Sequence, residues 1–286
     1  MEKDKVLLAG ATGYLGGYVM KELLSGGFDT RILVRDKSGV KIESGNLEVV
    51  EAEVTRPGTL EGLFDDRDVV ISTVGITRQK DGLTYMDVDY RGNANLIDEA
   101  KRAGVRKFIY VSVLNGEKLR HLKICDAKEK LVDYLKSSGL DYAVIRPNGF
   151  FSDMGDFLKM AKGGRVYLFG DGTPKLNPIH GEDLAEVVVA AIDSDTKETD
   201  IGGPDILSQN EIAGLALKAY SKPVKISHLP DWIRRFTLRI LRTFTSSKTY
   251  GPIEFFMTTM AMDMRSPQYG KRRLEDFFNE EAGKPA

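Results

Sequence analysis

A glycine-rich turn between an apolar segment and an amphipathic segment constrains the fold of this chain most. Residues 6–9 (VLLA) form an apolar run typical of a strand that is buried on both faces. Glycines 10, 13 and 16 follow at once, and residues 18–24 have helical periodicity up to a Ser-Gly-Gly stop. We expect the first glycine to allow a tight turn, the second to admit a phosphate group near the backbone, and the third to let the helix pack on the strand. The pattern therefore predicts a dinucleotide whose pyrophosphate lies at the helix N-terminus, where N–H groups and the helix dipole attract an anion.

The rest of the first half alternates between apolar and amphipathic segments. Helices are expected near residues 57–64, 93–103 and 122–136, between successive strands. Strands alternating with helices predict an α/β fold, a doubly wound parallel sheet of the Rossmann type, with ligands at the carboxyl ends of the strands. The further strands are expected at residues 30–34, 47–50, 68–72, 105–113 and 140–145.

Composition excludes several classes of protein. The 41 Lys and Arg residues balance 42 Asp and Glu residues, so the chain lacks the basic excess that nucleic-acid binding normally needs. The single cysteine, Cys125, excludes an internal disulfide framework and fits a reducing compartment. No apolar run reaches the roughly 20 residues that span a bilayer, and the N-terminus has no signal-peptide pattern. We therefore expect a cytoplasmic protein with a hydrophobic core of ordinary size.

The turn, as GATGYLG, resembles the short-chain dehydrogenase/reductase superfamily, most closely its extended and atypical branches, whose members bind NAD(P)(H). Similar segments continue over roughly residues 4–203: VEAEVT resembles the family's adenine-contacting segment, STVG its loop after the fourth strand, and YAVIRPNGFF its segment near the nicotinamide. The residues that the resemblance assigns to the cofactor are Gly10, Thr12, Gly13, Tyr14, Leu15, Gly16, Glu53, Val54, Thr73, Val74, Gly75, Lys128, Pro147 and Asn148.

Arg35, the first residue after the second predicted strand, indicates the choice of cofactor. An acidic residue at this point would bind the ribose hydroxyls of NAD, whereas a guanidinium suits the 2′-phosphate of NADP. Lys37 and Lys41 add positive charge nearby, and Asp36 favours the opposite choice. We predict NADP(H) in preference to NAD(H), with Arg35 as a cofactor-binding residue.

The expected catalytic set is incomplete. Typical members of the superfamily use a Ser, and a Tyr and a Lys four residues apart on one helix face. The resemblance places Ser112 and Lys128 as the Ser and the Lys, with Ser112 orienting the substrate oxygen. The position four residues before Lys128 holds Ile124, which cannot transfer a proton.

Two functions are compatible with the missing Tyr. The isoflavone-reductase and divinyl-reductase groups work without it, with a proton from Lys128, from a residue such as His121, or from solvent. The alternative is a chain without turnover, as in NmrA-like redox sensors and photosystem-assembly relatives. We favour an NAD(P)H-dependent oxidoreductase that transfers hydride to a hydrophobic small molecule, on fold-level analogy. The histidines lack metal-ligand spacing, so no metal site is predicted.

The C-terminal region is expected to form a small substrate lobe. We place a dinucleotide-binding domain at 1–160 and the lobe, interleaved with the last sheet elements, at 161–286. Ser208 and Glu211 predict a capping box at a helix start. Residues 231–244 form an amphipathic helix that we interpret as packed on the core; contact with a membrane surface or a partner is the less favoured alternative. Phenylalanines and methionines in 252–262 line either a hydrophobic substrate pocket or the core.

Overall fold

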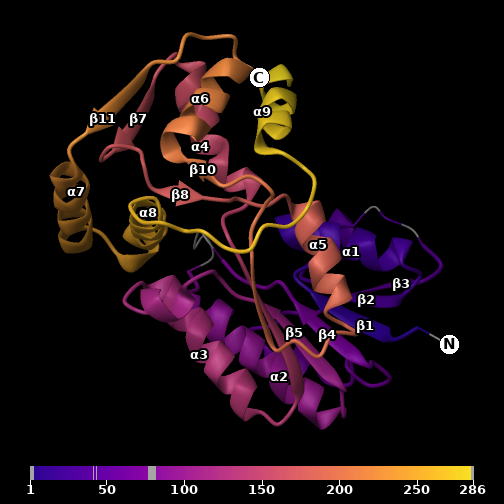
Figure 1. Cartoon of the computed structure of the whole chain (residues 1–286). Helices are drawn as coiled ribbons and strands as arrows, with labels where there is room; N and C mark the ends of the chain where they lie inside the picture. Colours follow the sequence, from indigo (N-terminus) through magenta and orange to yellow (C-terminus); the bar gives the residue numbers. More distant parts are fainter. Residues whose placement is uncertain (1–2, 41, 43, 77–81, 285–286) are drawn as a thin grey trace. The chain divides into compact units, whose positions relative to one another are not determined.

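The computed structural model describes residues 3–40, 42, 44–76 and 82–284 (Figure 1). Lys41, one of the residues that we associated with the cofactor phosphate, lies outside the described residues. The chain divides into two compact units, the first comprising residues 1–146 and 184–199 and the second residues 147–183 and 200–286. The units are described separately below.

A seven-stranded sheet organises the first unit. Its strand order is β3-β2-β1-β4-β5-β6-β9, and every pairing from β3 to β6 is parallel. The order reverses direction between β1 and β4, which is the point where open α/β sheets bind ligands. The predicted doubly wound sheet is confirmed. The strands are β1 (Lys5–Ala9), β2 (Asp29–Val34), β3 (Leu47–Glu51), β4 (Val69–Ser72), β5 (Lys107–Val111), β6 (Asp141–Pro147) and β9 (Glu198–Ile201).

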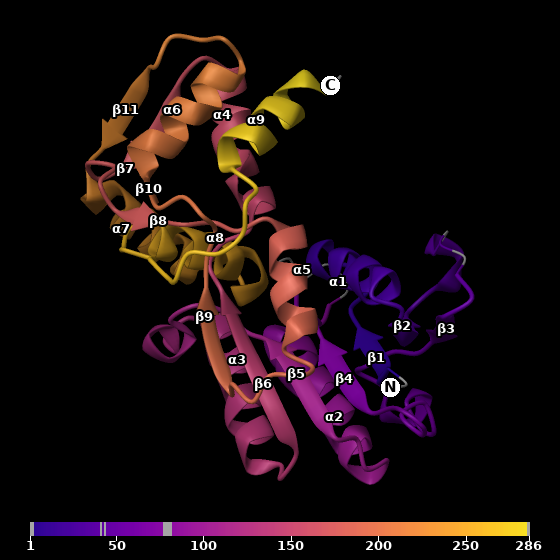
Figure 2. The same ribbon diagram turned by 45° about the vertical axis from the view of Figure 1, so that its right-hand side comes forward.

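Helices cover both faces of this sheet. Apolar residues of α2 (Asn93–Arg102) and α3 (Lys123–Ser137) share one buried cluster with residues of the central strands, while α1 (Tyr14–Ser25) lies on the opposite face (Figures 1 and 2). The central strands are buried because both of their faces are covered, which explains their uninterrupted apolar sequences. Helix α5 (Gly181–Ala190) begins within the residues of the second unit and ends within those of the first.

Two segments differ from the expected helices. The helix predicted at 57–64 is wrong: only Pro57–Thr59 forms a single 3₁₀ turn, and Gly62 has a φ of +75°, which a helix cannot contain. Ahead of α2, residues Met86–Gly92 form a π-helical segment that the sequence pattern did not predict. Such wide turns are rare and frequently lie at functional sites.

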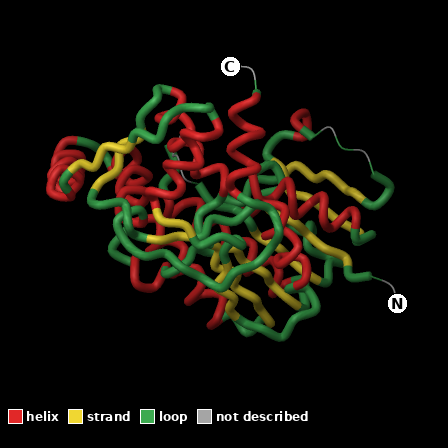
Figure 3. Tube along the Cα trace, turned by 45° about the horizontal axis from the view of Figure 1, so that its top comes forward, coloured by secondary structure: helices red, strands yellow, loops and turns green. Residues whose placement is uncertain are grey.

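The second unit is built mainly from helices. Helices α4 (Gly155–Lys162) and α9 (Leu274–Gly283) both pack on α6 (Gln209–Ala219), and α9 ends the chain (Figure 3). The predicted capping box is confirmed, since Ser208 accepts from the Glu211 amide and the Glu211 carboxylate accepts from the Ser208 amide. The remaining elements are strands β7 (Val166–Phe169), β8 (Lys175–Leu176), β10 (Leu207–Ser208) and β11 (Ile226–Leu229), and helices α7 (Asp231–Phe244) and α8 (Ser247–Thr259).

The apolar residues of α7 that we expected to pack on the core are only partly covered. Phe236 and Phe244 are 57% and 79% exposed, and Leu238 is the one buried residue of the helix. The helix packs against α8 and β7, and Ile233 and Leu241 are half-buried, so the packing prediction is wrong only for the exposed residues. Among the described residues, no helix is both long and apolar enough to cross a membrane.

Candidate functional site

The glycine turn at the end of β1 has the geometry that its spacing predicts. Gly10 has a φ of +92°, and a Cβ there would lie 2.5 Å from the Thr73 hydroxyl oxygen. A Cβ on Gly16 would lie 2.0 Å from the Gly10 carbonyl oxygen, so only glycine lets α1 approach the turn this closely. The Gly13 amide donates to the same carbonyl at 2.9 Å. The turn therefore fixes where α1 starts relative to β1.

The start of α1 is open to an anion. Gly13 is the N-cap residue, no side chain caps the helix, and its first turn contains no acidic residue. Thr12, Gly13 and Tyr14 are exposed, whereas Leu15 is buried and can offer a ligand only its main chain. An uncapped helix start without negative charge suits a pyrophosphate. The residues of this turn thus fit the dinucleotide that the sequence predicts.

Hydrogen bonds hold the loop after β4 next to this turn. The Thr73 hydroxyl donates to the Ala9 carbonyl at 3.2 Å, and the Ser72 hydroxyl donates to Asn93 Oδ1. The Asn93 amide also donates to the carbonyls of Val74 and Asp89, at 3.2 and 3.0 Å. The sequence analysis did not identify Asn93, a buried residue that joins the loop to the π-helical segment.

A buried ion pair lies against this loop. Lys128 Nζ lies 3.0 Å from Asp89 Oδ1, with side-chain exposures of 14% and 0%. A Cβ on Gly75 would lie 2.8 Å from that oxygen and 2.9 Å from the ammonium nitrogen, and the Ile76 amide donates to Asp89 Oδ2 at 3.2 Å. Gly75 therefore makes room for the pair, which lies against the loop after β4.

The charges in this cluster shift the pKa of each group. Burial raises the pKa of Asp89, an effect that Lys128 partly offsets. Burial by itself would lower the pKa of Lys128, but Tyr110 and Asp89 outweigh it and hold this pKa above its ordinary value. The surroundings of Lys128 therefore favour its charged ammonium form.

Tyr110 places a phenol beside Lys128, but it lies on strand β5 and not on the helix that carries the lysine. Lys128 Nζ donates to the Tyr110 hydroxyl at 3.4 Å, but Tyr110 lies on β5 and is fully buried, and burial raises its pKa to about 12. Ile124, at the position of the usual Tyr, is buried and apolar. The signal for Tyr110 was its place on the predicted strand, two residues before Ser112.

Ser112 belongs to a second buried network. Its hydroxyl donates to Glu129 Oε1 at 3.1 Å, and Arg146 Nη2 donates to Glu129 Oε2 at 3.0 Å. Glu129 has no exposed surface, and Ser112 is 6% exposed. Among the described contacts, Ser112 is joined to this carboxylate rather than to Lys128, and its catalytic role stays a prediction.

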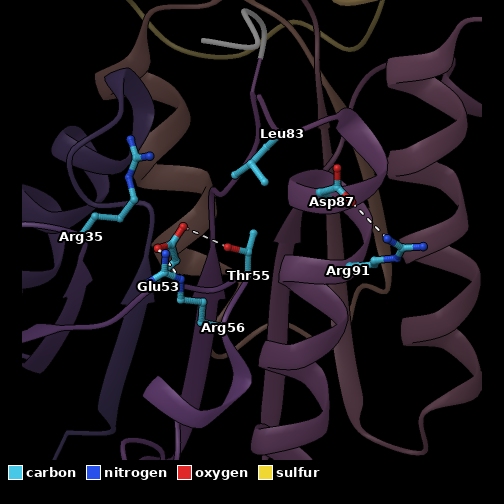
Figure 4. Close-up of a pocket in the computed structure, with 7 residues that line it drawn as sticks. All are labelled: Arg35, Glu53, Thr55, Arg56, Leu83, Asp87 and Arg91. Carbon is cyan, nitrogen blue, oxygen red and sulfur yellow. Dashed lines mark hydrogen bonds and ion pairs between the residues drawn. The ribbon is translucent and has the colours of Figure 1, made fainter. Parts of the chain in front are cut away.

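A polar pocket of about 450 Å³ lies beyond the ends of β2 and β3. Figure 4 shows Glu53, Thr55 and Arg56 between Arg35 and the Asp87–Arg91 pair. Thr55 donates to Glu53 at 2.9 Å, Arg56 lies 3.4 Å from Glu53, and Arg91 lies 3.1 Å from Asp87. The pocket is lined by Arg35, Glu53, Thr55, Arg56, Leu83, Asp87 and Arg91. Arg35 is thus accompanied by two arginines that the sequence analysis did not identify.

Asp36, the residue that favours NAD, has a local role. Its carboxylate accepts from the Ser38 amide at 2.8 Å and caps a short 3₁₀ turn. Hydrogen bonds from the Ser38 side chain and backbone lower the pKa of Asp36. The Asp36 carboxylate, next to Arg35 in the chain, therefore already accepts a hydrogen bond from Ser38. Val54, which the resemblance also assigns to the cofactor, is half-buried and packs against the hydrophobic core of the first unit.

Pro147 and Asn148 belong to the second unit. Pro147 ends β6, and the Asn148 amide donates to Asn177 Oδ1 at 2.9 Å and to the Met264 carbonyl. Asn148 is 5% exposed, so its side chain holds segments of this unit together. The predicted contact of both residues with a nicotinamide stays a prediction.

The parallel sheet, the glycine turn at its switch point and the uncapped α1 define a dinucleotide-binding α/β protein. The sequence model of a family described as NAD(P)H-binding matches residues 10–195. The chain belongs to this NAD(P)H-binding family, and the resemblance to the atypical and extended short-chain dehydrogenases/reductases is confirmed. These findings support a nicotinamide cofactor.

Relatives of two kinds are among those that the chain resembles. The chain is 27% identical over 315 residues to divinyl chlorophyllide a 8-vinyl-reductase of Cucumis sativus, covering 96% of this chain and 75% of the relative. It is 26% identical over 247 residues to the photosystem II assembly factor Ycf39 of Synechocystis sp., covering 84% and 74%. Among solved structures, a nucleoside-diphosphate-sugar epimerase from Staphylococcus aureus has the same fold, with a TM-score of 0.76, 18% identity and coverage of 96% and 99%.

Proposed function

We propose that this chain is an NADPH-dependent reductase that delivers hydride to a hydrophobic small molecule. The observation that carries the proposal is the Asp89–Lys128 pair, buried against the loop after β4, whose Thr73 contacts the glycine turn. Burying two charges is expensive for a fold, and replacing such a pair by apolar residues often stabilises a protein. Ionisable groups in such surroundings concentrate at functional sites. A chain that only folds and docks would gain little from this pair.

Several segments of the first unit would bind different parts of the cofactor. The Gly10–Gly16 turn would bind the pyrophosphate, and Glu53 and Val54 would border the adenine. The loop from Thr73 to Gly75 would line the dinucleotide, and Lys128 would bind the ribose next to the nicotinamide. When bound, NADPH supplies the hydride.

The pocket that Arg35, Arg56 and Arg91 line, here called the arginine pocket, supports NADPH in preference to NADH. Arg35 carries a guanidinium at the end of β2, and Arg56 lines the same pocket. A 2′-phosphate would receive charge-assisted hydrogen bonds there. The nearest acidic side chain along the chain, Asp36, already accepts the Ser38 amide.

The charge on Lys128 indicates the kind of reaction. Hydride addition leaves negative charge on the acceptor, and a fixed ammonium stabilises that charge without having to move. Ile124 cannot donate a proton, so the reaction that suits this site is reduction of an electron-poor C=C bond, whose second carbon takes its proton from solvent. The name of the Cucumis sativus relative, a vinyl-reductase, is consistent with this class.

Turnover of NADPH with a set of acceptors tests the proposal. Anaerobic oxidation of NADPH is followed by absorbance with conjugated alkenes, quinones and divinyl chlorophyllide. Lys128→Met should lower kcat on the order of a hundredfold, because a fixed charge near the reacting atoms is lost. Lys130→Met is the matched control, since Lys130 is exposed on the same helix and pairs with Asp126. Equal kcat values for the two variants would contradict the proposal.

A second candidate function is NADPH binding without turnover, in a sensor or an assembly factor. The observation that favours it is Ile124, which is buried where the usual acid would be. The Synechocystis relative named as an assembly factor is consistent with it. This candidate predicts that the wild-type chain binds NADPH and oxidises it with none of the acceptors.

A further inference from the structure

Helix α7 exposes an unusual amount of apolar surface. Trp232, Phe236, Ile240 and Phe244, here called the apolar stripe, are 60%, 57%, 40% and 79% exposed. They recur every four residues, so they follow one another along one face of the helix. Of the ten large hydrophobic side chains that are exposed among the described residues, these are four. Single exposed apolar residues need no explanation, but a continuous row marks an interaction surface.

The fold of the second unit does not use this stripe. The helix packs against α8 and β7, at the edge of the unit (Figure 1), and its buried residue is Leu238. Leu238 lies two residues from Phe236 and Ile240, which places it on the other side of the helix. The apolar stripe is therefore not part of the hydrophobic core of this unit.

A row of arginines runs beside the stripe. Arg235, Arg239 and Arg242 recur at spacings of four and three residues and are exposed. Arg235 pairs with Asp231 at 3.2 Å and Arg242 pairs with Glu254, yet both side chains keep more than half of their surface in solvent. No ion pair of Arg239 is found within the described part of the chain. The helix carries four arginines and one acidic residue, whereas the whole chain has a net charge of −1.

We propose that α7 docks the protein on an anionic lipid surface, lying in the plane of the headgroups. The apolar stripe would enter the boundary between headgroups and acyl chains, and the arginine row would contact lipid phosphates. Interfacial helices combine a cationic polar flank with Trp, Phe and Leu on the other side, and Trp favours this boundary. The stripe lies on the convex face of a single helix, which a deformable bilayer accepts without a matching groove. The positive flank complements anionic lipid rather than a neutral surface.

The single tryptophan of the chain makes the proposal directly measurable. Because Trp232 is the only tryptophan, its emission reports on α7 alone. Titration with vesicles of equal parts phosphatidylglycerol and phosphatidylcholine should shift this emission to the blue and bring the protein down with the vesicles. Vesicles of phosphatidylcholine alone should bind it much more weakly. An unchanged emission together with absence of co-sedimentation would overturn the proposal.

Matched variants separate the contribution of the apolar stripe to vesicle binding from that of the arginine row, and they leave Trp232 in place. Phe236→Ser/Phe244→Ser should weaken vesicle binding by at least about tenfold, since each ring loses its burial. Arg235→Gln/Arg239→Gln should weaken it by about fivefold per arginine with anionic vesicles and little with neutral ones. The control Ile206→Ser/Val224→Ser removes two other exposed apolar side chains of the same unit and should leave binding unchanged. Equal losses in the control and in the stripe variant would contradict docking through α7.

Self-association is the competing use of the same stripe. If a second copy of the chain covers it, the emission shift should appear with rising protein concentration in the absence of lipid. Sedimentation velocity would then show a dimer that the Phe236→Ser/Phe244→Ser variant abolishes. That result would overturn the lipid proposal. Circular dichroism and Tm of each variant establish that the fold is intact.

Discussion

At the scale of the residue, the chemistry of the candidate site depends on how Lys128 is held. The superfamily pattern would place a phenol four residues before the lysine, and this chain has Ile124 there. The structure instead surrounds the ammonium with the Asp89 carboxylate from the π-helical segment and the Tyr110 hydroxyl from β5. The lysine is thus charged and fixed by groups that are distant in sequence.

A double-mutant cycle measures how strongly Asp89 and Lys128 depend on each other. Either Asp89→Asn or Lys128→Met leaves a buried group without its partner, and each should cost about 3 kcal/mol. The double variant should cost less than the sum of the two, because neither uncompensated charge then remains. Urea unfolding gives the three free energies. Additive values would mean that the two groups do not interact.

Cys125 provides a residue-scale test of burial. It has no exposed surface, and burial raises its pKa to about 12, so the folded chain holds a neutral thiol. A disulfide reagent at pH 8 should react only as fast as the protein unfolds. Since the unfolded thiol ionises near its ordinary pKa of 9.0, this group should make the free energy of unfolding fall as the pH rises from there toward about 12. Rapid labelling of the native protein would contradict the burial.

At the scale of the element, the glycine turn contains one glycine that the fold requires and another that ligand binding requires. Gly16 faces the Gly10 carbonyl so closely that a Cβ has no space. Gly13 has a φ of −77°, and a Cβ there would meet nothing nearer than the same carbonyl oxygen, at 3.3 Å. The two glycines are therefore needed for different reasons.

Alanine at each position should separate these reasons. Gly16→Ala should destabilise the protein by about 3 kcal/mol or more, because a backbone contact of 2.0 Å cannot be relieved by rotating a side chain. Gly13→Ala should cost roughly 1 kcal/mol and yet weaken NADPH binding strongly, because the methyl group occupies the approach of the pyrophosphate. Tm and fluorescence titration check the two effects. Similar loss of stability in both variants would contradict the distinction.

Local patterns predicted those elements whose cause is local. The buried strands, the turn at Gly10 and the capping box at Ser208 follow from residues that are adjacent in sequence, and the structure contains all of them. The π-helical segment, Asn93 and Tyr110 were not found, because their roles arise from partners that only the folded sheet brings close. The exposure of Phe236 and Phe244 on α7 was not predicted, because periodicity shows that a helix has an apolar face and does not show what covers it.

At the scale of the whole molecule, overall charge says little about where anions would bind. The net charge of −1 hides two local concentrations of arginine, one in the pocket beside β2 and β3 and one along α7. The first supports recognition of a nucleotide phosphate and the second a lipid surface. Each has its own variants, so failure of one proposal leaves the other standing.

The central claim is that an anionic dinucleotide binds at the N-terminus of α1 with its adenosine end in the arginine pocket. Calorimetric titration of the wild-type chain and of Arg35→Asp with NADPH and NADH tests it most directly. We expect one NADPH per chain, bound about tenfold or more tighter than NADH, because charge-assisted bonds form only with the 2′-phosphate. Arg35→Asp should lose most of this preference. Well-folded wild-type protein that takes up neither nucleotide, and whose Tm neither nucleotide raises, would contradict the claim.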